Sequence, residues 1–370
     1  MKIALYNLTT TTKSGGIETF NWEMARVLSR RGHTVHIYGG KSGPPREGPP
    51  GVPVFTYPFI RRECFPNFGT RFRRFMERLS FGFSSLRDLI RRRYDFLYLI
   101  KPYDIPIALL VSARSGAKVI FGSSGTEFFP GYKSLVRKAH HFFACSEFNA
   151  SQIEQYCGIR PDVIHNGVDT GMFRPLTADP ELRNTLGLRD RDAVILTVGR
   201  LVALKGIRHG IMAVDALLRK GYRIKYLIAG EGPERENLRS LVKALHREED
   251  IFFLGNIANP ALPAYYACAD MALFPSVAEE AFGIAVAEAM ACGIPSVAAA
   301  VGAIPEVTGD AGLLVPPGDA GALALALEKI VNSAGMRSAL GAKGRRRIED
   351  KFNWDTIADK FEGHILRGSA

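Results

Sequence analysis

The chain has 370 residues, of which 46% are hydrophobic and 23% are charged. This ordinary globular composition excludes a disordered chain, and no apolar run approaches the roughly 18 residues that a membrane span needs. The length exceeds that of a typical single core, so we expect two domains. The net charge of +11 lies in the first half, because residues 1–165 hold 24 Lys and Arg against 12 Asp and Glu.

Five cysteines are scattered along the chain without a Cys-x-x-Cys pair, at Cys64, Cys145, Cys157, Cys268 and Cys292. This pattern favours free thiols in a reducing cytosol over a disulfide framework or a zinc site. The eight histidines show no metal-ligand spacing either. Residues 1–6 are followed by a polar stretch, which indicates a strand and not a signal peptide. We therefore expect a cytoplasmic protein without a metal or another cofactor.

The first half alternates buried strands with helices. Residues 2–6 are predicted to form a strand, which leads through Gly15 and Gly16 into a helical pattern. A glycine pair between a strand and a helix lets the backbone come close to a ligand. Further strands are predicted at residues 35–38, 96–100, 119–121 and 142–145.

The turn Asn166-Gly167-Val168-Asp169 marks the predicted domain boundary. Strands at residues 194–198, 226–229, 251–254, 271–274 and 295–299 then restart the alternation with helices. We predict a Rossmann-like first domain at residues 1–167 and a Rossmann-like second domain at residues 168–352, facing each other across a cleft. The terminal helix, residues 353–370, has an apolar face that we expect to pack back on the first domain.

The most informative stretch joins the strand at residues 271–274 to an alanine-rich helix that ends at Gly293. Glu280 lies in the connecting loop, free to accept hydrogen bonds from hydroxyl groups. Glu288 lies on the helix, and its side chain tilts back toward the loop. Between them, the free amides of the first helical turn suit a phosphate. An ordinary amphipathic helix with a solvated Glu288 is the alternative.

With these residues in view, the chain resembles the retaining nucleotide-sugar glycosyltransferases of family 4, which have the GT-B fold. The resemblance covers nearly the whole chain and rests on several motifs in the family's order. The matching segments are Gly15-Gly16, Asn166-Gly167-Val168-Asp169, Gly199-Arg200-Leu201 with Lys205-Gly206, Glu280-Ala281-Phe282-Gly283 with Glu288, and Ile304-Pro305-Glu306.

The resemblance implies roles for single residues. The cations Arg200 and Lys205 would act in catalysis by stabilising the charge that develops on the leaving nucleoside diphosphate. Catalytic Glu280 would bind the hydroxyls of the donor sugar. The remaining donor-binding residues would be Gly15, Gly16, Asn256, Ile257, Ala281, Phe282, Gly283, Ile284 and Glu288, with the base near Asn256 and Ile257 and the ribose at Glu288. No metal is expected.

Residues 123–127 depart from the family's pattern, because many relatives have a histidine there that contacts the donor sugar. This leaves the identity of the sugar, and whether the donor is a UDP-sugar or a GDP-sugar, open. Asp190 and Asp192 have the form of a metal-binding Asp-x-Asp pair but precede a strand. Gly230 and Gly232 lack the third glycine of a dinucleotide site. A non-catalytic nucleotide-sugar-binding protein remains an alternative, and no nucleic-acid-binding motif accompanies the positive charge.

Residues 61–93 hold ten arginines against three acidic residues. Arg71, Phe72, Arg74, Phe75 and Arg78 have the pattern of a basic amphipathic helix that lies on an anionic membrane. We therefore predict a peripheral enzyme at the inner face of the cell membrane. Its acceptor would be a glycan or lipid-linked molecule, as in lipopolysaccharide biosynthesis. The alternatives are a helix packed on the first domain and a soluble small-molecule acceptor; the sequence does not predict the oligomeric state.

Overall fold

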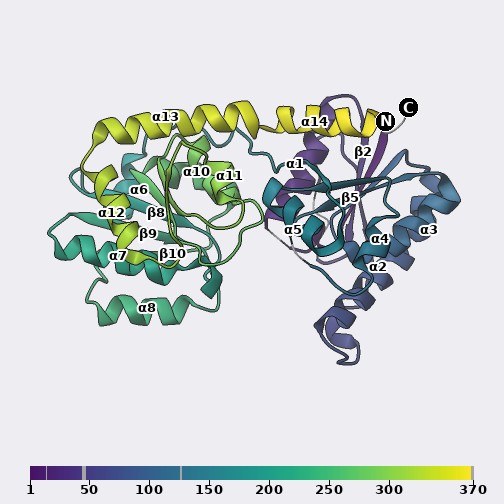
Figure 1. Ribbon diagram of the computed structural model, residues 1–370, viewed down its shortest axis with the longest axis horizontal. Coiled ribbons are helices and arrows are strands. Elements are labelled where there is room, and N and C mark those ends of the chain that lie inside the picture. Colours follow the sequence, from purple (N-terminus) through teal and green to yellow (C-terminus); the bar gives the residue numbers. More distant parts are fainter. Residues whose placement is uncertain (14, 44–46, 126, 368–370) are drawn as a thin grey trace. The chain divides into compact units, whose positions relative to one another are not determined.

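The computed structural model describes residues 1–13, 15–43, 47–125 and 127–367 (Figure 1). Contacts within the chain divide it into two compact units. The first unit comprises Met1–Gly167 together with the C-terminal segment from Trp354 onward, and the second unit comprises Val168–Asn353. Among the described residues, no helix combines the length and the low polarity that crossing a bilayer requires.

The first unit is built on a parallel sheet with seven strands in its described part, in the order β3-β2-β1-β4-β5-β6-β7. The strands are β1 Lys2–Tyr6, β2 Thr34–Gly40, β3 Val54–Tyr57, β4 Phe96–Leu99, β5 Lys118–Ser123, β6 His141–Ala144 and β7 Asp162–Val163. The chain starts in the middle of the sheet, so that β1 pairs with β2 on one side and with β4 on the other. Ligands of doubly wound sheets bind outside the carboxyl ends of the strands, where the strand order reverses in this way.

Helices cover both faces of the first sheet because its strands are apolar on both sides. Ile3 and Leu5 belong to the hydrophobic cluster with α1 Gly16–Arg30 and α14 Trp354–Arg367. Ala4 and Tyr6, which point the other way, belong to a second cluster. That cluster contains residues of α2 Thr70–Arg92, α3 Ile105–Ser115, α4 Tyr132–Val136 and α5 Glu147–Cys157. The short helices η1 Leu8–Thr11, η2 Arg62–Cys64 and η3 Pro102–Asp104 lie in the connections.

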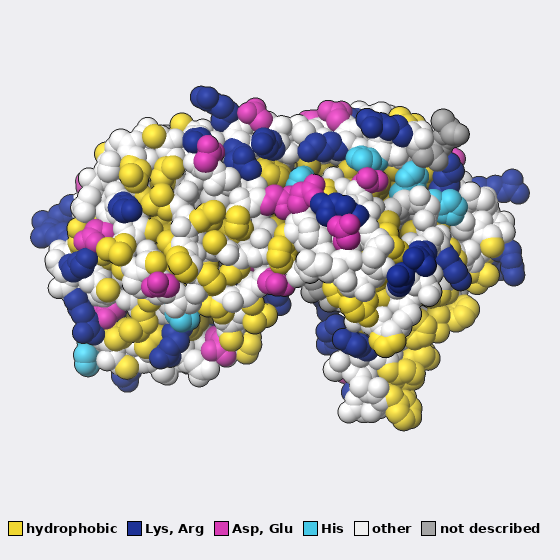
Figure 2. Space-filling view, viewed as in Figure 1, with side chains coloured by type: hydrophobic (Ala, Val, Ile, Leu, Met, Phe, Trp, Pro, Cys, Tyr) yellow, Lys and Arg dark blue, Asp and Glu magenta, His cyan; other side chains and the backbone are white. Residues whose placement is uncertain are grey.

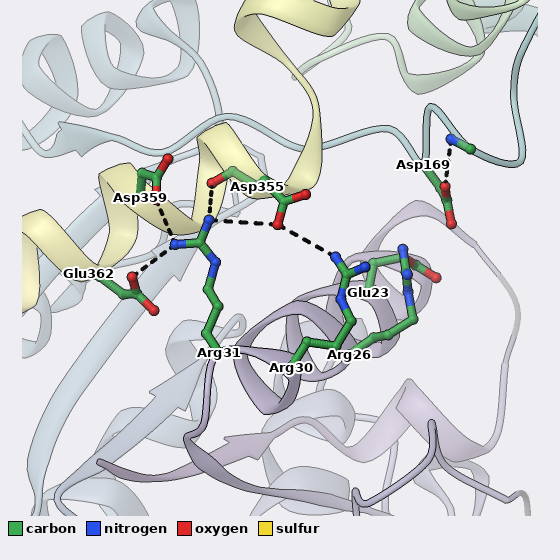
Figure 3. A network of polar contacts seen from close by, with 9 residues as sticks. Glu23, Arg26, Arg30, Arg31, Asp169, Asp355, Asp359 and Glu362 are labelled. Atoms are coloured by element: carbon green, nitrogen blue, oxygen red, sulfur yellow. Dashed lines mark hydrogen bonds and ion pairs between the residues drawn. The ribbon is translucent and has the colours of Figure 1, made fainter.

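The C-terminal helix α14 packs on α1 of the first unit. Trp354 and Phe361 are buried, and the ring of Trp354 lies 5.5 Å from that of Phe20. Figure 3 shows the polar contacts at the edge of this packing, where Arg31 Nη1 donates to Asp359 at 2.6 Å and to Glu362 at 3.0 Å. Such partly exposed ion pairs contribute little, so the buried aromatic side chains supply most of the stabilisation.

The second unit has a parallel sheet with the order β10-β9-β8-β11-β12-β13. The strands are β8 Ala193–Val198, β9 Ile224–Ala229, β10 Ile251–Gly255, β11 Met271–Phe274, β12 Ser296–Ala299 and β13 Leu313–Val315. Numbered within the unit, this is the order 3-2-1-4-5-6 of the Rossmann fold, which reverses between β8 and β11. The predicted fold class of two Rossmann-like α/β domains is confirmed.

Helices also cover both faces of the second sheet. One hydrophobic cluster includes residues of α9 Leu262–Ala267, α10 Ile284–Ala291, α11 Ile304–Thr308 and α13 Ala334–Lys351. The cluster on the other face includes residues of α7 Ile207–Arg219, α8 Arg235–Ala244 and α12 Ala320–Val331. The remaining helices are α6 Pro180–Thr185, η4 Ala203–Lys205 and η5 Asn259–Ala261.

Arg78 of α2 is buried, which contradicts the prediction that it faces a membrane. Its guanidinium donates to Asp104 through Nε at 2.8 Å and through Nη2 at 2.6 Å. Nη2 also donates to Asn7 Oδ1 at 2.8 Å. Arg78 lies on the helix face that also carries Phe81 and Ser85, and that face packs into the unit. Arg71, Arg74 and Arg78 recur at helical spacing, but they do not share the same exposure to solvent.

Arg78→Ala should lower the free energy of unfolding by about 3–5 kcal/mol, because the Asp104 carboxylate would stay buried without its cation. Urea unfolding followed by circular dichroism measures this loss. Arg87→Ala, at an exposed position of the same helix, is the control and should change the value by less than about 0.5 kcal/mol. Arg78→Met combined with Asp104→Leu should recover much of the loss. A loss for Arg78→Ala no larger than that of the control would contradict a buried ion pair.

Candidate active site

A pocket lies in the second unit where the strand order reverses. β8 and β11 are neighbours there, with Ile195 opposite Met271. The pocket is lined by residues that follow these strands and by the start of α10, including Gly199, Lys205, Ser276, Glu280, Gly283 and Ile284. Four of the predicted site residues thus meet in one pocket, namely Lys205, Glu280, Gly283 and Ile284.

A close approach of two backbone segments places Lys205 in this pocket. Gly206 has φ of +62°, and a Cβ atom there would lie 2.0 Å from the carbonyl oxygen of Pro275. The Val277 amide also donates to the Leu204 carbonyl at 3.0 Å. Any side chain at position 206 would force the segment after β8 away from the segment after β11. The glycine after Lys205 therefore has a steric role in the site.

Glu280 holds Lys205 directly. Lys205 Nζ lies 2.5 Å from Glu280 Oε1, and the hydroxyl of Ser276 donates to the same oxygen at 2.8 Å. The other oxygen, Oε2, has no partner among the described residues and can accept a hydrogen bond from a ligand. Glu280 is therefore held in its loop more firmly than expected, because two side chains fix one of its oxygens. Ser276 was missed, since in the sequence it is only the turn residue after a strand.

The first turn of α10 forms one wall of the pocket. The helix begins at Ile284, preceded by Gly283 with φ of +93°. The Val286 amide already donates to the Gly283 carbonyl at 3.0 Å. The amides of Ile284 and Ala285 are therefore the ones in the first turn that can bind an anion. Phe282 is buried and packs its ring 5.7 Å from that of Phe352, so its side chain belongs to the core. Ala281, beside it, is partly buried.

Glu288 is buried on α10, outside the residues that line this pocket. Burial raises the pKa of its carboxyl from 4.5 to about 8, although the Asn259 amide at 3.4 Å counteracts this. The carboxyl is therefore protonated at neutral pH, and its contribution to stability falls as the pH rises from 4.5 to about 8. Asn259 is a second residue that sequence reasoning missed, although it lies close to the predicted base-binding segment.

The other predicted residues of the second unit lie at the same carboxyl edge of the sheet. Arg200 follows β8 and is exposed, and its side chain has no polar partner among the described residues. Asn256 is exposed and Ile257 partly buried in the segment after β10. None of the three lines the pocket of Lys205, and Ile257 packs against the hydrophobic cluster on one face of the sheet.

In the first unit, Gly15 lies directly before α1, and Gly16 is the first residue of the first turn of that helix. The carboxylate of Glu18 is almost buried behind this turn and accepts a hydrogen bond from Thr9 Oγ1 at 2.5 Å. In the loop that departs from the family's pattern, Thr126 lies outside the described residues. Glu127 accepts a hydrogen bond from Lys101 at 2.7 Å, so this carboxylate is already paired within its own unit.

The residues predicted to contact a membrane divide between two environments. Arg71 and Arg74 are exposed, and Arg74 lies 3.9 Å from Glu127. Phe72 packs against Phe68, and Phe75 lies 6.5 Å from Tyr103, so both rings are partly buried. Among the described residues of the whole chain, no group of three or more His, Cys, Asp or Glu could hold a metal ion.

Comparisons with known sequences match both halves of the chain. Residues 14–171 match the family described as Glycosyltransferase Family 4, and residues 178–347 match the family described as Glycosyl transferases group 1. An uncharacterized glycosyltransferase of Methanocaldococcus jannaschii is 32% identical over 58% of the chain. That match covers 54% of the relative, so the chain spans about half of its length.

Two further comparisons span nearly the whole chain. A GDP-mannose-dependent alpha-(1-6)-phosphatidylinositol monomannoside mannosyltransferase of Mycobacterium tuberculosis is 27% identical, covering 96% of the chain and 95% of the relative. A solved structure of the Anabaena protein HepE, in complex with UDP and glucose, has a TM-score of 0.80 at 20% identity, covering 99% of this chain and 100% of that one. These matches and the two doubly wound sheets show that the chain belongs to glycosyltransferase family 4 and has the GT-B fold.

Proposed function

We propose that the protein transfers a sugar from a nucleotide-sugar donor to an acceptor with retention of configuration. The observation that carries this proposal is the pocket at the strand reversal of the second unit, where a lysine, a carboxylate and a helix start meet. The M. tuberculosis relative is named GDP-mannose-dependent and the Anabaena structure contains UDP and glucose, which supports a nucleotide-sugar donor. Retention is inferred from the family alone.

The donor diphosphate would bind Lys205, Arg200 and the first amides of α10. Negative charge develops on the leaving nucleoside diphosphate as the glycosidic bond breaks, and fixed cations and amides stabilise that charge. These groups would replace a divalent metal.

The two glutamates would bind different hydroxyl groups of the donor. Oε2 of Glu280, which has no partner in the described part of the chain, would accept a hydrogen bond from the transferred sugar. Glu288 would bind the ribose, and the backbone at Asn256 and Ile257 would contact the base. Hydrogen bonds from ribose hydroxyls favour the ionised carboxylate, so they would counteract the raised pKa of Glu288.

We place the acceptor site in the first unit and propose that the protein works at the cytoplasmic face of an anionic membrane. Figure 2 shows hydrophobic side chains along one edge of the segment that carries η2 and the start of α2, with Lys and Arg side chains near them. Phe68 there is 76% exposed, and Ile60 is 52% exposed. Each arginine near an anionic surface contributes about 1 kcal/mol. A lipid-linked acceptor, as in envelope glycan assembly, agrees with the phosphatidylinositol-based acceptor in the name of the M. tuberculosis relative.

Lys205→Ala and Arg200→Ala should each lower kcat by about 10²–10³-fold, because each removes a charge that acts in the transition state. Release of free UDP or GDP from a nucleotide sugar measures turnover, and circular dichroism checks the fold. Lys243→Ala, at an exposed position on α8, is the matched control and should leave turnover unchanged. Wild-type turnover in a folded double variant of Arg200 and Lys205 would disprove the assignment.

Treatment with EDTA should leave turnover unchanged, because the cations and helix amides are proposed to take the place of a divalent ion. The same release assay with and without Mg²⁺ or Mn²⁺ tests this. Loss of activity in EDTA that either metal restores would contradict the proposal.

The protein should co-sediment with vesicles that contain phosphatidylglycerol, and high salt should release it, because screening weakens the attraction between charges. Arg71→Ser combined with Arg74→Ser should weaken this binding at low salt. Arg87→Ser combined with Arg91→Ser, at the other end of α2, is the control with the same change of charge. Equal binding of both double variants, or no binding of the wild type, would favour a soluble acceptor.

A further inference from the structure

Ser276 is a buried hydroxyl residue of the candidate active site. It lies directly after β11 and Pro275, lines the pocket and is only 3% exposed. Its hydroxyl donates to Glu280 Oε1 at 2.8 Å. A serine hydroxyl can donate one hydrogen bond, and in this site the hydroxyl donates it to the Glu280 carboxylate.

The loop that carries Glu280 is held from its other side by the segment after β12. The amide of Ala303 donates to the Glu280 carbonyl at 2.8 Å. Gly302 lies so close that a Cβ atom there would be 2.3 Å from the same carbonyl oxygen. The backbone of Glu280 is therefore fixed without help from its side chain. The direction of its carboxylate depends on Ser276 and Lys205, which both contact Oε1.

These two contacts differ in what a donor would do to them. Lys205 is partly exposed, with 29% of its side chain accessible, so an incoming diphosphate can reach its ammonium. Ser276 is buried and uncharged, so the charge of an anionic ligand does not draw its hydroxyl away from Glu280. Apart from Lys205, the serine is the one side-chain partner of Oε1 in the described part of the chain.

We propose that Ser276 is a positioning residue for sugar transfer, an inference that rests on the donor roles given above. Its hydroxyl holds Oε1 of Glu280 while Lys205 binds the diphosphate, so that Oε2 stays directed at a hydroxyl group of the donor sugar. A carboxylate fixed in advance loses less conformational freedom when the sugar binds and in the transition state. This role is exerted through Glu280 and needs no contact of Ser276 with the phosphates or the base.

Ser276→Ala should lower kcat/KM for the nucleotide sugar by roughly 10- to 100-fold, the effect of one hydrogen bond to a charged group. Affinity for UDP or GDP alone, measured by calorimetry, should stay unchanged, because those ligands carry no sugar for Glu280 to bind. If the role of Ser276 were merely structural, Ser276→Ala would lower kcat/KM and also weaken the affinity for UDP or GDP. That result would overturn the proposal.

Two further variants of the residue keep the test informative if alanine disturbs the fold. Ser276→Thr retains the hydroxyl and should keep most of the activity, whereas Ser276→Cys keeps the volume but donates weakly and should resemble alanine. Equal activity of the threonine and cysteine variants would also overturn the proposal. Ser296→Ala is the matched control, because this buried serine of the same unit has a hydroxyl without a partner among the described residues.

A double-mutant cycle separates this inference from the proposed function. Ser276→Ala should add almost nothing to the loss caused by Glu280→Gln, since the serine is proposed to act through that glutamate. If Glu280→Gln has wild-type turnover, the proposed role of Glu280 fails. If Glu280→Gln is impaired but Ser276→Ala behaves like Ser296→Ala, only the positioning role fails.

Discussion

The candidate site depends on the absence of a side chain at Gly206. Because the backbone at this position touches the carbonyl of Pro275, the segments after β8 and β11 run side by side at the reversal of strand order. That contact brings a lysine from one segment to a glutamate and a serine from the other. The ion pair between Lys205 and Glu280 is thereby formed by residues that lie 75 positions apart in the chain. The sheet brings the carboxyl ends of β8 and β11 together, and Gly206 allows the segments after them to come into contact.

Much of the fold follows from local sequence patterns. Apolar runs bounded by glycine and proline predicted the strands, and their alternation with helical patterns predicted parallel sheets, because parallel strands need a crossover between them. The motifs around Lys205 and Glu280 identified the strand ends that form the pocket. The sequence could not show that these two side chains bind each other, since that contact arises only when β8 and β11 become neighbours. For the same reason, Ser276 and Asn259 could not be distinguished from ordinary loop residues.

Helix α2 shows the limit of periodicity most clearly. A helical pattern tells which residues share a face, but the surroundings of that face can change along a helix of 23 residues. At its start, Arg71 and Arg74 are exposed to solvent, whereas Arg78, one turn further on, meets Asp104 and Asn7 in the interior. The sequence gives no sign of this change, because the carboxylate that pairs with Arg78 lies on a different element.

The path of the chain between the units has a consequence for how they can be separated. The first unit is discontinuous, because α14 returns to it after the whole second unit has been completed. A fragment that stops at Gly167 would leave Phe20, Tyr98 and Phe143 without the aromatic and aliphatic side chains of α14 that cover them. Residues 168–353, by contrast, form one uninterrupted stretch with both faces of their sheet covered. During synthesis, the first unit can therefore complete its hydrophobic core only after the second unit has been made. The unit whose synthesis begins first is the last to complete its fold.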